Sequence, residues 1–201
     1  MRRLFFAVFL VVACATVAAA DSIEKAGHAS GRGDYVQAER LYRSLAEQGD
    51  PKAQYFLGMM YANGQGVPQD YKKAMTWIGK AAVQGDAEAQ YRLGLMYADG
   101  KGVSQDNQEA VRWIRKAAEQ GHAGAQLGLG LTYYTGRRGI PRDNIRAHMW
   151  FSIAASALSG YEGKRAMAHR DEIASQLTGL QIGKAQERAR RCQQSKFKEC
   201  D

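Results

Sequence analysis

The sequence predicts an all-α fold, an αα-superhelix (solenoid) of antiparallel helix pairs, with about three full repeats, an N-terminal half-repeat and C-terminal helices. The main observation is a 36-residue period: residues 49–84 read GDPKAQYFLGMMYANGQGVPQDYKKAMTWIGKAAVQ, and residues 85–120 follow directly as GDAEAQYRLGLMYADGKGVSQDNQEAVRWIRKAAEQ. Twenty-two of the 36 aligned positions are identical. A third copy starts at Gly121 with one extra residue in its Arg137-Arg138 loop, and a half-copy spans 33–48. Such self-similarity indicates stacked supersecondary units, which usually present an extended surface to a partner.

The first half of each copy predicts a helix that ends at glycines. In the second copy, Ala89, Leu93 and Tyr97 recur at a spacing of four, so they share one helical face. Gly94, beside Leu93, removes a side chain where a second helix can approach closely. Residues 99–102 (Asp-Gly-Lys-Gly) end the helix, because glycine adopts the left-handed conformation that a chain reversal requires.

The second half of each copy predicts a partner helix. Asp106 suits the N-cap position, and the inward face repeats Ala110, then Trp113 or Ile114, then Ala117. One such pair leaves much of its apolar surface in water, so neighbouring pairs must stack to bury it. Each copy contributes a tryptophan that we expect at these contacts: Trp77, Trp113 and Trp150.

The fixed positions of the copies form a motif that resembles the Sel-one-like repeat (SLR), a relative of the tetratricopeptide repeat. The first copy carries the motif at Ala53, Leu57, Gly58, Tyr61, Gly64, Gly66, Val67, Asp70, Ala74, Trp77, Lys80, Ala81, Ala82 and Gly85, and the second copy has the same residues 36 positions later. The third copy departs at Ile153 and Leu158, as a terminal repeat with a different neighbour would. The resemblance implies a right-handed superhelix that acts as an adaptor for other proteins. Bacterial members of the family are often exported or envelope-associated.

The repeats divide the chain into segments. We expect a signal peptide at 1–20, N-terminal capping helices at 21–48, three repeats at 49–84, 85–120 and 121–158, and C-terminal helices with a basic tail at 159–201. In the last segment, helical character is expected over 159–177 and 180–192, with Thr178 as the cap between them.

The N-terminal residues are typical of export. Arg2 and Arg3 precede an unbroken apolar run over 4–13, which is too short to span a bilayer, and small residues lead to a cleavage site after Ala20. The alternative is that Val-Val-Ala-Cys at 11–14 resembles a bacterial lipobox, which would leave Cys14 lipidated and the protein anchored to a membrane. Both interpretations predict a periplasmic, secreted or lipid-anchored protein in the bacterial envelope.

Cysteine usage fits an exported protein. With Cys14 cleaved off or lipidated, Cys192 and Cys200 remain as an even pair, and an oxidising compartment favours a disulfide between them. An uninterrupted helix would hold them about 12 Å apart, whereas a disulfide needs Cα atoms within about 7 Å. We therefore expect the helix to end near Cys192 and residues 193–195 to turn the chain back.

Composition and motifs argue against chemistry at a local site. The formal charge is +8, or +6 without Arg2 and Arg3, which is ordinary for a solvated helical protein. The four histidines (His28, His122, His148 and His169) have no metal-ligand spacing, and no nucleophile, phosphate-loop or paired-carboxylate motif appears. We expect no enzyme, no metal, no cofactor and no nucleic-acid partner. Some relatives with a disulfide in every repeat are linked to β-lactam or peptidoglycan chemistry, but this chain lacks those cysteines.

The first helix of each copy carries a second row of side chains, apart from the inward face, and this row is the candidate docking surface. With the glutamines beside it, the surface comprises Gln54, Tyr55, Met59, Gln90, Tyr91, Leu95, Gln126, Leu127 and Leu131. One helix series of a helical-pair solenoid lines the concave side, where an extended peptide or a partner helix would lie. The alternative is that the row is simply core between the repeats.

The favoured function is therefore a non-catalytic, exported scaffold that binds another envelope protein or peptide. The second interpretation is a binder of peptidoglycan or another anionic envelope polymer, which Lys184, Arg188 and Arg191 on one side of the last helix would attract. An enzyme ranks third.

Overall fold

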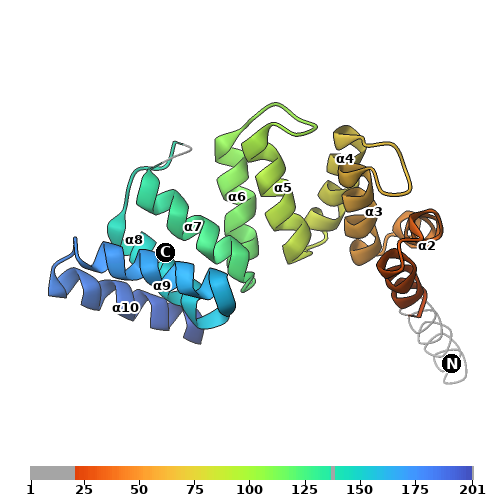
Figure 1. Ribbon diagram of the computed structural model, residues 1–201. Coiled ribbons are helices and arrows are strands. Elements are labelled where there is room, and N and C mark those ends of the chain that lie inside the picture. The colour runs from red at the N-terminus through yellow and green to blue at the C-terminus, as the bar shows by residue number, and fades with distance from the viewer. Residues whose placement is uncertain (1–20, 137–138, 201) are drawn as a thin grey trace, which may run out of the picture. The chain divides into compact units, whose positions relative to one another are not determined.

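The computed structural model describes residues 21–136 and 139–200, and within these ranges all regular secondary structure is helical (Figure 1). The chain forms two compact units, Met1–Gln84 and Gly85–Asp201. The expected signal peptide, Cys14 and the Arg137-Arg138 loop lie outside the described residues. Among the helices that are described, none is both long and apolar enough to cross a membrane.

The first unit begins with helical residues 21–31 and continues through three helices. These are α2 (Tyr35–Glu47), α3 (Pro51–Asn63) and α4 (Tyr71–Val83). Helix α3 packs against both α2 and α4, so consecutive helices contact one another. Buried side chains of α3 and α4, Leu57 and Ile78 among them, fill the space between the helices of the first full repeat.

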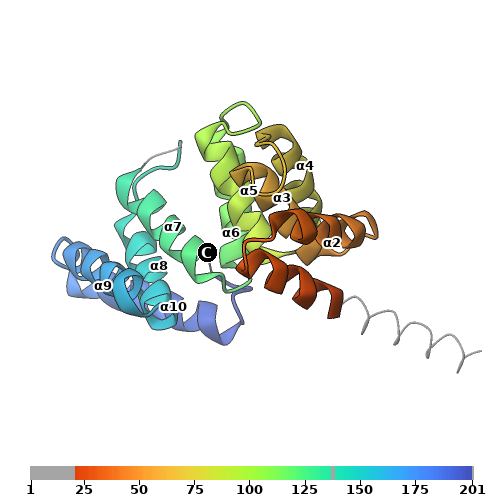
Figure 2. The same cartoon turned by 45° about the vertical axis from the view of Figure 1, so that its right-hand side comes forward.

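The second unit contains the next two repeats and the C-terminal helices. Its elements are α5 (Ala87–Asp99), α6 (Asn107–Ala118), α7 (Ala123–Thr135), α8 (Asn144–Ala157), α9 (Gly160–Ala174) and α10 (Gly179–Gln194). Each helix from α5 to α7 contacts the next one, and α8 contacts both α9 and α10 (Figure 2). Helix α8 is consequently buried on most sides, with Trp150 and Phe151 both fully inaccessible.

The ends of the helices follow the predicted chemistry. Asp106 caps α6, since its carboxylate accepts hydrogen bonds from the backbone N–H groups of Gln108 and Glu109. Gly100 ends α5 with a φ of 67°, in the left-handed region that favours glycine. Thr178 caps α10, as the sequence predicts, and the structure adds a capping box between Thr178 and Gln181.

Glycines inside the first helices permit close packing of each pair. A Cβ atom at Gly94 would lie 2.7 Å from Cγ1 of Ile114 and 2.9 Å from the carbonyl oxygen of Ala110. Gly58 and Gly130 occupy the equivalent places in the other repeats, against Ile78 and Phe151 respectively. The glycine therefore lets the backbone of the first helix lie directly against side chains of the second, at a cost of about 1 kcal/mol in helix propensity.

The three tryptophans do not share one environment. Trp150 is completely buried because α9 and α10 cover α8, whereas Trp113 is only partly buried. Ile114, with 2% of its surface exposed, takes the inward position that the sequence leaves open between the two residues. The ammonium of Lys116 lies 4.3 Å from the centroid of the Trp113 ring, and Lys80 lies over Trp77 in the same way. These tryptophans thus combine packing with a cation–π contact at the surface.

The C-terminal disulfide joins Cys192 to Cys200, with Cα atoms 4.4 Å apart, as the sequence predicts. The predicted turn over residues 193–195 is displaced, because α10 continues to Gln194. The chain instead reverses at Lys196 and Phe197, whose φ angles of 54° and 65° are left-handed. This later reversal lets the Phe197 ring pack on the core cluster beside Gly121.

Candidate functional site

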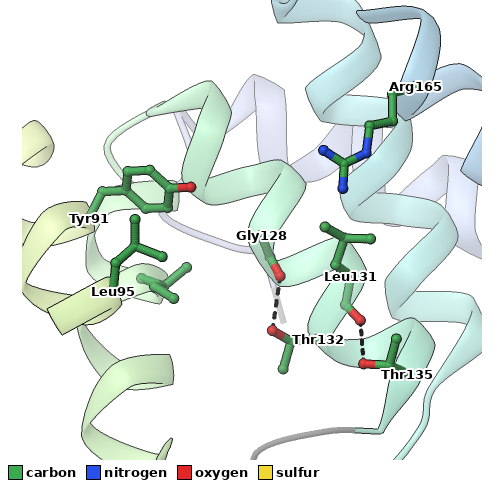
Figure 3. Close-up of a pocket in the computed structure, with 8 residues that line it drawn as sticks. Tyr91, Leu95, Gly128, Leu131, Thr132, Thr135 and Arg165 are labelled. Carbon is green, nitrogen blue, oxygen red and sulfur yellow. Dashed lines mark hydrogen bonds between the residues drawn. The ribbon is translucent and has the colours of Figure 1, made fainter. Parts of the chain in front are cut away.

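A groove in the second unit is the candidate site. It is lined by residues of four helices: Tyr91 and Leu95 of α5, Ile114 of α6, Gly128, Leu131, Thr132 and Thr135 of α7, and Arg165 of α9. Its volume is about 370 Å³, within the range typical of ligand-binding pockets. Figure 3 shows Tyr91 on one side, Arg165 on the other, and Gly128 and Leu131 between them.

The floor of the groove is apolar. Leu95 and Leu131 are partly exposed, while Ile114 beneath them is almost fully buried. The two threonines turn their hydroxyl donors toward their own helix, since Thr132 Oγ1 donates to the carbonyl of Gly128 at 2.9 Å and Thr135 Oγ1 to that of Leu131 at 2.8 Å (Figure 3). Both hydroxyl hydrogens are therefore already donated, so each hydroxyl has only acceptor capacity left for a bound partner.

The wall formed by Tyr91 is built from small residues of α7. A Cβ atom at Gly124 would lie 3.5 Å from Cε1 of Tyr91, and one at Gly128 would lie 3.8 Å from Cε2 of the same ring. The His122 ring, at the N-cap of α7, also packs against Tyr91, with the ring centroids 4.7 Å apart. The ring of Tyr91 is therefore held between the start of α7 and the groove.

Arg165 enters the groove from α9, which several contacts hold in place. Ala166 of α9 is fully buried, and the backbone at Gly163 lies so close to Leu158 that a Cβ atom there would be 2.5 Å from the carbonyl oxygen of Leu158. At the other end of α9, the Tyr134 hydroxyl of α7 donates to Glu172 Oε1 at 2.6 Å. This hydrogen bond raises the pKa of the tyrosine and lowers the pKa of the carboxyl.

The sequence-predicted docking residues separate into two groups. Tyr55, Met59, Tyr91, Leu95 and Leu131 are partly exposed. The last three meet in the groove, while the first two lie on α3 in the other unit.

The glutamines of the candidate docking surface and Leu127 are buried, so the predicted surface is corrected at these positions. Gln54, Gln90, Gln126 and Leu127 expose at most 6% of their surface. Gln54 Nε2 donates to the carbonyl of Ala46 at the end of the preceding helix. The amides thus serve helix packing rather than a surface.

A hydrogen-bonded pair of glutamines recurs in the first two repeats and is absent from the described residues of the third. Gln84 donates to Gln54 Oε1 at 2.8 Å, and Gln120 donates to Gln90 Oε1 at the same distance 36 residues later. Gln126 keeps the bond to the preceding helix through Ala118, but among the described residues its Oε1 has no partner. The pairing ends because α8 brings no glutamine to this place.

Five lining residues were not identified from the sequence: Ile114, Gly128, Thr132, Thr135 and Arg165. The alignment of the copies does carry a signal for Gly128, which stands where the earlier copies have Phe56 and Arg92. Loss of that side chain in the third copy leaves the groove open. Arg165 gives no such signal, because it lies beyond the repeats.

The described residues show no sign of a metal centre, since no group of three or more His, Cys, Asp and Glu side chains among them is placed to hold an ion. The groove itself combines apolar side chains, hydroxyl acceptors and one guanidinium. Apolar side chains with a few polar groups among them are the usual lining of a binding pocket.

Comparison with known proteins relates the chain to repeat proteins. The Sel1 repeat matches four consecutive stretches, at residues 25–50, 51–86, 87–122 and 123–157. The chain is similar to a protective antigen of uropathogenic Escherichia coli strains that displays an SLR fold, with 31% identity, a TM-score of 0.56, and coverage of 81% of this chain and 41% of the antigen. No curated protein matches it.

A Sel1 repeat protein from Oxalobacter formigenes is also 31% identical, with a TM-score of 0.60, over 70% of this chain and 62% of its own. The chain spans less than two thirds of the length of either protein. The four matched repeats cover well over half of the chain, and both structural neighbours are repeat solenoids of the same kind. The chain therefore belongs to the Sel1 repeat family.

Proposed function

We propose that this protein is a non-catalytic scaffold that binds a segment of another protein in the groove between α5 and α7. Membership of the Sel1 repeat family suggests protein–protein interaction in general. The observation that carries the specific proposal is the partly exposed apolar floor of Leu95 and Leu131, flanked by Tyr91 and Arg165 in a groove of about 370 Å³. Apolar surface of this kind, rimmed by polar groups, marks interaction sites.

The proposal includes a location in the bacterial envelope. The export-type N-terminus supports it, with either cleavage after Ala20 or lipidation at Cys14, and so does the disulfide between Cys192 and Cys200. Structural disulfides persist mainly in oxidising compartments. Measurement of the intact mass of the purified chain would distinguish cleavage after Ala20 from lipidation at Cys14. An unprocessed chain would contradict export.

The proposed docking function is tested by site-specific photocrosslinking in the producing cell. A photoreactive phenylalanine analogue is placed at Thr135, on the rim of the groove, and in a control chain at Gln186, which is exposed on α10. We expect one defined protein to crosslink at position 135 and not at 186. Excess unlabelled wild-type chain should compete for it, while a Gly128→Leu chain, whose new side chain fills the groove, should not.

Equal crosslinking from both positions, or equal competition by the Gly128→Leu chain, would contradict binding in the groove.

A second candidate function is binding of peptidoglycan or another anionic envelope polymer. It is favoured by α10, where Lys184, Arg188 and Arg191 have no ion-pair partner within residues 21–136 and 139–200. Retention on purified peptidoglycan that falls with rising salt, and that is lost when the three residues become glutamine, would support this function. Retention that neither change affects would contradict it.

A further inference from the structure

We infer that the groove selects partner segments in which a carboxylate accompanies an aliphatic side chain, and that Arg165 is the residue that recognises the carboxylate. This inference rests on the proposed function, because it names the partner chemistry of the same groove.

Arg165 is the charged residue among the eight that line the groove. It lies on α9, outside the stretches that the Sel1 repeat matches, so it is a feature of this chain rather than of the repeat. The Arg165 side chain is 42% exposed and forms an ion pair at 3.5 Å with Glu162, whose side chain is 47% exposed. An ion pair this exposed and this far apart contributes little to stability. The guanidinium can therefore turn to a better acceptor at small cost in free energy.

The polar groups of the groove distinguish donors from acceptors. Thr132 and Thr135 give their hydroxyl hydrogens to backbone carbonyls, so they offer oxygens to a partner's N–H groups. The guanidinium of Arg165 offers the complementary donors and points into the groove (Figure 3). A guanidinium binds a carboxylate through two parallel hydrogen bonds, which gives both affinity and geometry.

The apolar floor supplies the second element of recognition. Leu95, Ile114 and Leu131 form a surface with no charged side chain of its own, beside the Arg165 guanidinium. A segment that places an aliphatic side chain on this floor brings its backbone N–H groups toward the threonine oxygens. An acidic group next to that side chain then meets Arg165.

The test uses peptide display on the intact mature chain. Random peptides are selected on the wild-type protein, on Arg165→Glu and on Lys164→Glu, a control that makes the same charge reversal at the adjacent exposed residue. We expect wild-type selections to be rich in Asp or Glu beside Leu, Ile or Val, and Arg165→Glu selections to be rich in Lys or Arg. A synthetic wild-type peptide should bind Arg165→Glu at least about tenfold more weakly and Lys164→Glu equally well.

The source of the carboxylate is resolved with the same peptide. Equal binding of the free-acid and C-terminally amidated forms would assign recognition to an Asp or Glu side chain, and loss on amidation would assign it to the chain terminus. We expect equal binding of the two forms, because the inference assigns the carboxylate to an Asp or Glu side chain; loss of binding on amidation would contradict that assignment.

The inference and the proposed function fail in different ways. Peptides that Gly128→Leu blocks, but that carry no acidic preference or bind Arg165→Glu normally, would overturn the role of Arg165 and leave the groove as the docking site. Peptides that Gly128→Leu does not block, or a selection that yields none, would overturn both.

Discussion

His122 Nε2 lies 2.8 Å from Glu88 Oε2, and this contact joins the first helices of two successive repeats. The other ring nitrogen, Nδ1, accepts the backbone N–H of Ala125 at 3.0 Å and so caps α7. Accepting at Nδ1 places the proton on Nε2, which therefore donates to the carboxylate. Asp86 has the capping role in α5, so the third copy has replaced an aspartate cap with a histidine that also reaches the preceding repeat.

Replacement of His122 by alanine is expected to lower the free energy of unfolding by about 1–2 kcal/mol, because the substitution removes an N-cap bond. It also removes the support behind Tyr91, so partner affinity should fall. Urea unfolding of the variant measures the first effect. The control is His28→Ala, since His28 is exposed and has only a 3.9 Å contact with Glu24. Equal stability of the two variants would contradict the capping role.

Replacement of Gly94 by alanine is expected to destabilise the protein by about 1–3 kcal/mol through overpacking, despite the better helix propensity of alanine. The new Cβ would meet Ile114 and the carbonyl of Ala110 at distances below 3 Å. Gly183→Ala is the matched control, because Gly183 lies within α10 with nothing within 4 Å of its Cβ position. Thermal melting should show a lower Tm for the first variant and an unchanged or higher Tm for the second. A Tm increase in both would show that the helix pair has room at Gly94.

Stability should fall in mild acid because of His148. Burial lowers the pKa of this imidazole; the nearby Arg170 lowers it further and Asp171 opposes the shift. In the unfolded chain a histidine has a pKa of about 6.5, so as the pH falls below that value the unfolded state binds a proton that the folded state resists. The free energy of unfolding should therefore decrease as the pH falls, by at most about 1.4 kcal/mol per pH unit from this group.

His148→Gln removes that titration. The difference in free energy of unfolding between wild type and this variant, measured by urea unfolding, should favour the variant more at pH 5.5 than at pH 7.5. A difference that is independent of pH would show that His148 does not titrate on unfolding.

Loss of the Cys192–Cys200 disulfide should cost about 2–3 kcal/mol, the value expected for closing so short a loop. The loop also holds Phe197 against Gly121 at the turn between α6 and α7. A reducing agent should lower the Tm of the wild type and leave the Cys192→Ser/Cys200→Ser protein unaffected. The finding of two free thiols in the purified mature wild type would exclude the disulfide.

Much of the fold could be predicted because it is periodic. A 36-residue period with a cap such as Asp106 and a helix-ending glycine such as Gly100 specifies each helix pair locally. The environment of Trp150 could not be predicted in this way, because its burial depends on α9 and α10, which follow the repeats. Local sequence signals define the helices of each repeat, whereas α9 and α10, which cover the last repeat, lie outside the periodic sequence.

The candidate site was predicted only in part. Tyr91, Leu95 and Leu131 could be found from helical spacing, since residues four apart share a face. Gln90 adjoins Tyr91 in the sequence but points about 100° away around the helix, toward the amide of Gln120 just beyond the end of α6, and is therefore buried. Arg165 reaches the groove through the packing of α9, and no spacing rule within the repeats could have indicated it.

The measurement that tests the central claim most directly is the affinity of the crosslinked partner for two glycine variants, Gly128→Leu and Gly183→Leu, together with the Tm of each. Both variants add the same side chain to a helix, one in the groove and one on the exposed face of α10. Docking in the groove predicts that Gly128→Leu loses binding while it still melts cooperatively, and that Gly183→Leu binds as the wild type does. Undiminished binding by a folded Gly128→Leu protein would contradict the assignment of the groove as the docking site.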